Sequence, residues 1–246
     1  MRFYQSGWFF MSIQLLNLID DLKLRMSRMT ARVLNVVETA TQAVIYNDLN
    51  LARTAMEADR IVDSEELDIE RRAIDLLALH QPAAADLRFI TRVIKVNGDF
   101  ERIGDCAVNV AQRVPSIARQ SVFNDSRERR EPVPDDLRRM GALVVSNLRD
   151  TINAFNLADP KMAARVLASD DEVDAYYHQI VQDMLQMFED KPHDAGRELA
   201  LVMVAKNYER IGDHCTNVAE DIIYMSSGEV VRHGKVISRG ATMLAS

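Results

Sequence analysis

Apolar residues recur every three or four positions along most of the chain, which is the spacing of amphipathic helices. The first such run extends from Ser12 to Tyr46 and predicts a helix on the order of 50 Å long, at about 1.5 Å per residue. The second run follows Asp48, a residue type that caps helix N-termini, and ends near Leu79. Pro82 then interrupts the pattern, because proline has no N–H to donate within a helix. The pattern therefore predicts two long helices joined by a short turn.

A third helix is predicted from about Ala84 to Arg119, where apolar residues again fall three and four positions apart. Residues 121–134 differ from it in composition, because they are polar and charged and contain two prolines. Such a composition is typical of a linker. The first half of the chain is therefore predicted to be a three-helix unit followed by a linker.

The helical pattern then restarts, and the second half repeats the first. Matching residues are displaced by 111 positions up to the second helical hairpin and by 108 positions beyond it. Asp159 corresponds to Asp48 and is followed by Pro160, a residue suited to the first helical position. Further matched pairs are Arg28 and Arg139, Met29 and Met140, Asp59 and Asp170, and Val62 and Val173. The chain thus contains an internal duplication.

The predicted fold class is all-α, with two tandem three-helix bundles produced by this duplication. We expect the first bundle over residues 12–120, the linker over 121–134 and the second bundle over 135–228. Residues 1–11 are either a segment ahead of a true start at Met11 or an extra surface strap. Residues 229–246 lose the helical periodicity and are expected to be a frayed tail.

Composition and charge exclude several classes of protein. The net charge of −7 and the pI near 5.3 argue against nucleic acid as a partner, since nucleic-acid-binding modules present a basic face. The two cysteines, Cys106 and Cys215, lie inside apolar helical patterns and are expected to be reduced core residues, which suits the cytoplasm. No apolar run is long enough for a membrane span. We therefore expect a cytoplasmic protein that meets a membrane only through its partners.

One twelve-residue segment occurs in both halves. It extends from Phe100 to Ala111 and again from Tyr208 to Ala219, with eight identical positions. Each copy carries a Glu, an Asp and an Asn four residues apart, so these side chains form one polar stripe on a helix. The stripes are Glu101, Asp105 and Asn109 in the first copy, and Glu209, Asp213 and Asn217 in the second.

Aspartates on the preceding helix lie opposite each stripe. Counted from Pro82, Asp63 and Glu101 are both 19 residues away, and Asp59 and Asp105 are both 23 away. Antiparallel helices would therefore bring the four to the same level, and we expect them to face outward, in or beside the groove between the helices. Clustered carboxylates are the ligands of hard or borderline cations such as Mg²⁺, Mn²⁺ or iron. The candidate metal ligands are Asp59, Asp63, Glu101 and Asp105 in the first half, and Asp170, Asp174, Glu209 and Asp213 in the second.

A solvated acidic helix face is the alternative interpretation of each stripe. Two observations favour a metal or partner site. First, both stripes have kept their residues while neighbouring positions differ. Second, each contains a mid-helix glycine, Gly104 or Gly212. Such a glycine lowers helix stability by about 1 kcal/mol relative to alanine, so it predicts a close approach by another group. His214 follows Asp213 and could add a ligand, although a lone helical histidine is more often a surface or core residue.

The segments Glu101-Arg-Ile-Gly-Asp105, Gln81-Pro82, Asp86-Leu87-Arg88 and Glu209-Arg-Ile-Gly-Asp-His214 make the chain resemble the PhoU family, bacterial regulators of phosphate uptake. The resemblance covers about residues 12–232. It implies two three-helix bundles related by pseudo-twofold symmetry, with metal ions or clusters held by the eight carboxylates named above. The metal could be iron, manganese, magnesium or zinc. The first motif has Cys106 where the family commonly has histidine.

The resemblance also implies a function. It predicts a non-enzymatic cytoplasmic adaptor between the ATPase subunit of a phosphate ABC transporter and a sensor histidine kinase, repressing the phosphate-starvation response when phosphate is plentiful. A homodimer is left open. One alternative is a carboxylate-bridged metal enzyme, but none of the five histidines has a Glu three residues before it, as that class requires. The other alternative is a purely structural helical scaffold.

Overall fold

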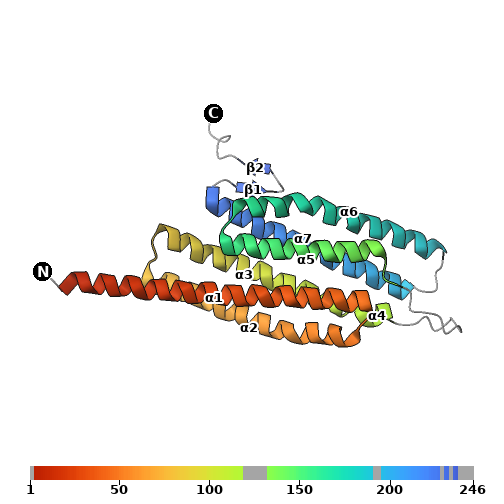
Figure 1. Ribbon diagram of the computed structural model, residues 1–246, viewed down its shortest axis with the longest axis horizontal. Coiled ribbons are helices and arrows are strands. Elements are labelled where there is room, and N and C mark those ends of the chain that lie inside the picture. Colours follow the sequence, from red (N-terminus) through yellow and green to blue (C-terminus); the bar gives the residue numbers. More distant parts are fainter. Residues whose placement is uncertain (1–2, 119–131, 191–194, 228–229, 233–234, 238–246) are drawn as a thin grey trace, which may run out of the picture.

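The computed structural model describes the chain except for residues 1–2, 119–131, 191–194, 228–229, 233–234 and 238–246. The first half consists of three long helices, α1 (Phe3–Tyr46), α2 (Leu49–His80) and α3 (Ala84–Ala111), followed by the short helix α4 (Val114–Ala118). The second half consists of α5 (Asp135–Leu157), α6 (Pro160–Asp190) and α7 (Ala195–Ser227). The long helices lie roughly along one axis (Figure 1), so the predicted pair of tandem three-helix units is confirmed.

The residues predicted to begin and end helices do so. The Asp48 side chain accepts hydrogen bonds from the backbone N–H groups of Asn50 and Leu51 at 2.7 and 3.1 Å, capping α2. Asp159 caps α6 in the same way. Gln81 ends α2 in the left-handed conformation, with φ of 45°, and Pro82 follows it. These caps satisfy N–H groups that the first helical turn leaves without partners.

The third helix is shorter than predicted. It ends at Ala111 instead of continuing to Arg119, and α4 follows after a turn in which the Arg113 N–H donates to the Val110 carbonyl oxygen at 3.0 Å. Pro115 explains the break, because it cannot donate to the Ala111 carbonyl and its ring would collide with it in a continuous helix.

The chain ends also differ from the prediction. α1 begins at Phe3 instead of Ser12, in a segment that contains no proline and only one glycine, Gly7. The tail contains a two-stranded antiparallel sheet, β1 (Val230–Arg232) with β2 (Lys235–Ile237), which the expectation of fraying missed. β-Branched residues in both strands favour this conformation. Most of the predicted linker, namely residues 121–131, lies outside the described residues.

The two halves share one apolar core, because α3 lies against α7 and α1 lies against α5. The Phe100 and Phe155 rings meet edge to face across the halves, with centroids 6.0 Å apart. Arg149 of α5 donates to Glu38 of α1 at 2.6 Å, and Lys95 of α3 pairs with Asp221 of α7. The halves are therefore joined by apolar contacts with ion pairs at their margin.

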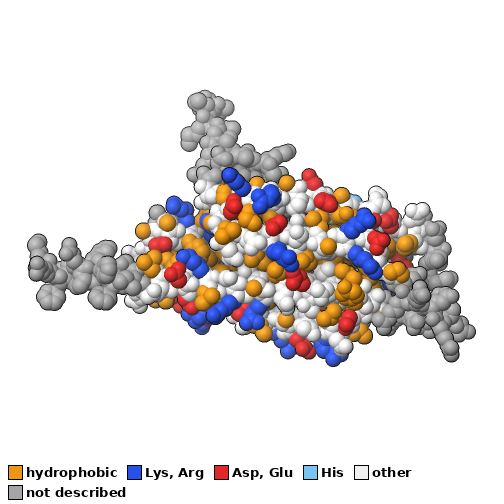
Figure 2. Space-filling view, in the orientation of Figure 1, with side chains coloured by type: hydrophobic (Ala, Val, Ile, Leu, Met, Phe, Trp, Pro, Cys, Tyr) orange, Lys and Arg blue, Asp and Glu red, His pale blue; other side chains and the backbone are white. Residues whose placement is uncertain are grey.

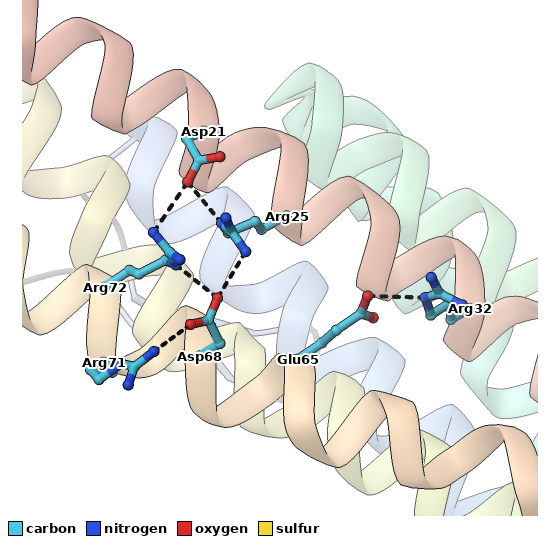
Figure 3. A network of polar contacts seen from close by, with 7 residues as sticks. All are labelled: Asp21, Arg25, Arg32, Glu65, Asp68, Arg71 and Arg72. Atoms are coloured by element: carbon cyan, nitrogen blue, oxygen red, sulfur yellow. Dashed lines mark hydrogen bonds and ion pairs between the residues drawn. The ribbon is translucent and has the colours of Figure 1, made fainter.

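Within the first half, a group of ion pairs joins α1 to α2 (Figure 3). Asp68 of α2 accepts hydrogen bonds from Arg25 at 2.9 Å and from Arg71 and Arg72 at 2.7 Å each. Arg25 also donates to Asp21. The arginines, Arg72 foremost, hold the pKa of Asp68 below its ordinary value. The repeat-related position in α6 is Gln179, so this arrangement around Asp68 belongs to the first half alone.

Candidate functional site

α2 and α3 bring together the four acidic residues predicted in the first half. Asp59 is only 8% exposed, Glu101 is half-buried, and Asp63 and Asp105 are exposed. Burial, followed by the nearby charges of Asp63, Asp105 and Glu101 in that order of effect, raises the pKa of Asp59 to about 6. The pKa of Glu101 is also raised, by burial and by Asp105 and Asp63. The four carboxylates therefore form one cluster, which we call the first-half cluster.

Asp59 lies deeper than predicted. The expectation that all four side chains face outward is wrong for this residue, because it sits on the side of α2 that contacts α3. Its Oδ1 atom is buried and has no hydrogen-bond partner. A Cβ atom at Gly104 would lie 2.8 Å from that oxygen, so only glycine leaves room for Asp59 here. This confirms the close approach predicted from Gly104.

α6 and α7 bring together the four predicted residues of the second half, Asp170, Asp174, Glu209 and Asp213, which we call the second-half cluster. Burial, followed by the charge of Asp174, raises the pKa of Asp170 to about 6, and burial also raises the pKa of Asp213. Asp170 is half-buried, so its environment is more open than that of Asp59. A Cβ at Gly212 would lie 3.3 Å from Asp170 Oδ1, a looser fit than at Gly104.

Two side chains beside the clusters were missed by the sequence reasoning. Lys206 Nζ donates to both carboxylate oxygens of Glu209, at 2.7 and 2.6 Å, and lies 5.3 Å from the centre of the Tyr177 ring. In the first half, Glu66 lies next to the cluster: burial, followed by the charges of Glu70 and Asp63, raises its pKa, and its own charge contributes to the raised pKa of Glu101. Comparing charges at repeat-related positions outside the shared motif would have revealed both residues.

The remaining candidates are a histidine beside the second-half cluster and two cysteines in the core. His214 Nδ1 lies 2.9 Å from Asp99 Oδ1 of α3, so this histidine contacts the other half of the molecule. Cys106 and Cys215 are free thiols with 0% and 1% exposure, and burial raises their pKa values to about 11 and 12. The prediction that both lie in the core is confirmed.

Comparison with known proteins identifies the family. The model of the PhoU domain matches residues 26–114 and again residues 137–222. The chain belongs to the PhoU family. The phosphate-specific transport system accessory protein PhoU homolog of Aquifex aeolicus is 33% identical over 222 residues, which are 90% of this chain and 97% of that protein. The homolog of Rhizobium meliloti is 32% identical over 204 residues, 83% of each chain.

Solved structures show the same fold. The crystal structure of PhoU from Pseudomonas aeruginosa matches with a TM-score of 0.77 and 28% identity, over 86% of this chain and 98% of that one. The phosphate transport system regulatory protein PhoU from Streptococcus pneumoniae matches with a TM-score of 0.78 over 90% of this chain and 99% of that one, at 23% identity. The two PhoU domains each contain one of the acidic clusters, so the clusters are repeated features of this PhoU chain.

The donors of the PhoU clusters suit a hard cation, although the side chains do not yet surround one. Among the described residues, no three acidic, histidine or cysteine side chains converge closely enough to hold one ion. Asp59 Oδ1, however, is a buried anionic oxygen with no partner, beside three further carboxylates. Oxygen donors of this type are what Mg²⁺, Mn²⁺ and Ca²⁺ prefer.

On the face shown in Figure 2, Lys and Arg side chains lie among Asp and Glu side chains and apolar patches. None of the helices in the described part of the chain has an apolar stretch long enough to cross a bilayer.

Proposed function

We propose that this PhoU-family protein is a cytoplasmic, non-enzymatic adaptor in phosphate-starvation signalling. It would contact the ATPase subunit of a phosphate ABC transporter and a sensor histidine kinase, and repress the response when phosphate is plentiful. The curated relatives are named accessory proteins of phosphate-specific transport systems, which supports a role alongside such a transporter. The observation that carries the proposal is the presence of an acidic cluster at the same place in each of two matched PhoU domains.

The physical argument rests on rigidity and charge. A packed helical face loses little backbone freedom when it binds a partner, so little of the binding energy is spent on ordering. Exposed carboxylates such as Asp63, Asp105 and Asp213 would attract a basic patch on the partner and make association sensitive to salt. Each cluster would also bind a divalent cation, which would offset the repulsion among its carboxylates.

The test is a phosphate-starvation reporter in cells whose own copy of the gene has been replaced. The test variant neutralises four cluster residues by Glu101→Gln, Asp105→Asn, Glu209→Gln and Asp213→Asn. The matched control removes the same charge from exposed acids elsewhere, by Glu57→Gln, Asp75→Asn, Asp135→Asn and Glu172→Gln. The test variant should derepress the reporter at high phosphate, while the control represses as wild type does and both proteins remain folded and abundant.

A binding experiment separates the adaptor from the alternatives. Purified transporter ATPase should bind the wild-type protein more weakly as salt rises, and should bind the four-residue variant more weakly than the control. A metal-dependent hydrolase or oxidase activity that the test variant lacks and the control keeps would replace the adaptor proposal with an enzyme. Full repression by the test variant would show that the acidic clusters are not needed for repression, and would remove the observation that carries the proposal.

A further inference from the structure

The two acidic clusters are not electrostatically equivalent. Gly98 of α3 and Lys206 of α7 occupy repeat-related positions, each three residues before the Glu of its motif. Glu66 of α2 corresponds in the same way to Tyr177 of α6. At these two positions the first half thus has a carboxylate, Glu66, and a glycine. The second half has a ring and, beside it, the ammonium group of Lys206.

In the second-half cluster, Lys206 already acts as a tethered counter-ion. Its Nζ lies within 2.7 Å of both oxygens of Glu209, and the Tyr177 ring lies beside it. A metal ion that used Glu209 would have to displace this ammonium group. It would then sit close to a second positive charge, which weakens its binding.

In the described part of the first half, no lysine or arginine forms an ion pair with the cluster, although the charge of Arg102 opposes the rise in the pKa of Glu101. Asp59 Oδ1 is buried and has no hydrogen-bond partner, at a residue that is 8% exposed. Glu66 is oriented by Asn97, whose amide donates to the Glu66 side chain at 3.2 Å and to its carbonyl oxygen at 2.9 Å. Asn97 has Ala205 as its counterpart, so this orientation also belongs to the first half alone.

We infer that the first-half cluster is the tighter divalent-cation site, with Glu66 as an additional ligand, and that Lys206 holds the second-half cluster in a weaker state. The inference rests on the metal-binding part of the proposed function. It adds which half binds first, which residue strengthens that site and which residue weakens the other.

The test is isothermal titration of the full-length, chelator-stripped protein with Mn²⁺. Two variants isolate the sites: Glu209→Gln with Asp213→Asn leaves the first-half cluster, and Glu101→Gln with Asp105→Asn leaves the second. The isolated first-half site should bind at least about tenfold more tightly than the isolated second-half site. Circular dichroism melts confirm that each variant is folded.

Reciprocal substitutions then move the lysine. Lys206→Met should tighten the isolated second-half site by about tenfold, whereas Lys206→Arg, which keeps the charge, should leave it unchanged. Gly98→Lys should weaken the isolated first-half site by a similar factor. A Cβ at residue 98 has no atom within 4 Å, so the lysine can be accommodated. Glu66→Gln should weaken the first-half site several-fold, with Glu57→Gln as the exposed control on the same helix.

The outcomes distinguish this inference from the proposed function. Two sites of equal affinity, or no effect of Lys206→Met and Gly98→Lys, would overturn the inference and leave metal binding in place. A tighter second-half site would also overturn it. If neither site binds Mn²⁺ at millimolar concentration, the metal-binding part of the proposed function fails together with the inference, while the reporter and ATPase experiments still decide the adaptor role.

Discussion

Asp59→Asn should stabilise the metal-free protein at neutral pH, although it replaces a buried residue. Asp59 is a carboxylate whose neighbours disfavour its charge, because it is buried against α3 and faces the charges of Asp63, Asp105 and Glu101. Asparagine keeps the shape of the side chain and removes that charge. The substitution therefore separates the electrostatic cost of the first-half cluster from its shape.

The size of the effect follows from the pKa. The pKa of Asp59 rises from an ordinary value of 3.8 to about 6. Each pH unit of that rise corresponds to about 1.4 kcal/mol, so ionised Asp59 lowers the free energy of unfolding by about 3 kcal/mol above pH 6. A buried amide without a partner costs about 1 kcal/mol in return. The net gain at pH 7.5 should be about 1–2 kcal/mol, or roughly 3–6 °C in Tm for a chain of this size.

The stabilisation by Asp59→Asn should increase with pH. Between pH 3.8 and about 6 the folded state keeps a proton on Asp59 that the unfolded state has released. Stability from this group therefore falls as pH rises through that window, and the advantage of Asp59→Asn should appear there and be complete above it. Thermal melts in chelator at pH 4, 5, 6 and 7.5 measure this, with the exposed Glu57→Gln on the same helix as a control that should change stability little. An equal loss of Tm at every pH would refute the reasoning, because it would show that the ionisation of Asp59 does not affect the stability of the fold.

Three further predictions concern other parts of the chain. Gly104→Ala should lower the free energy of unfolding by about 1 kcal/mol in chemical denaturation, because the new Cβ would meet Asp59 Oδ1 at 2.8 Å. Gly212→Ala should be nearly neutral, since the contacts of its Cβ begin at 3.3 Å. Equal effects of the two substitutions would contradict this prediction. Asp68→Asn should lower the free energy of unfolding by about 1 kcal/mol at pH 7 and low salt. The difference in stability between this variant and the wild type should vanish as pH falls below 3.8, because a carboxyl with a lowered pKa stabilises the fold only while it is ionised. Cys106 and Cys215 should react with a disulfide reagent at pH 8 only after unfolding. Both thiols are buried, and their pKa values are about 11 and 12. Rapid labelling of the native protein would contradict this and show that the core opens.

Local chemistry explains which structural features could be predicted from the sequence. Asp48 and Asp159 mark helix starts because their side chains satisfy free N–H groups, and Pro82 marks a break for an equally local reason. The matched spacing from Pro82 also placed Asp59 and Asp105 at one level, because antiparallel helices advance equally. Pro115 carried the same kind of information about the end of α3, but the apolar spacing continued across it and hid the break.

Features that depend on contacts between elements could not be predicted in this way. A helical projection gives the mean direction of a stripe, but it does not show that α3 covers Asp59 and leaves Asp63 exposed. The contact between His214 and Asp99 joins the two halves, whose relative placement is absent from the periodicity. Lys206 lies outside the shared motif, so its pairing with Glu209 was visible only by asking which charges differ between the repeats.

The same helix, α2, carries both a group of attracting charges and the repulsion of its cluster. Asp68 pairs with Arg25 of α1 and with Arg71 and Arg72 of its own helix, while Asp59 places an unpartnered anion against α3. In the second half both effects are reduced together: Gln179 replaces Asp68, and Lys206 neutralises part of the cluster. The ion pairs of Figure 3 thus hold α2 in place on one side while the cluster on its other side remains destabilised. A cation that relieves this repulsion would act on the contact between α2 and α3, so the first half is where cation binding should change the stability of the fold most.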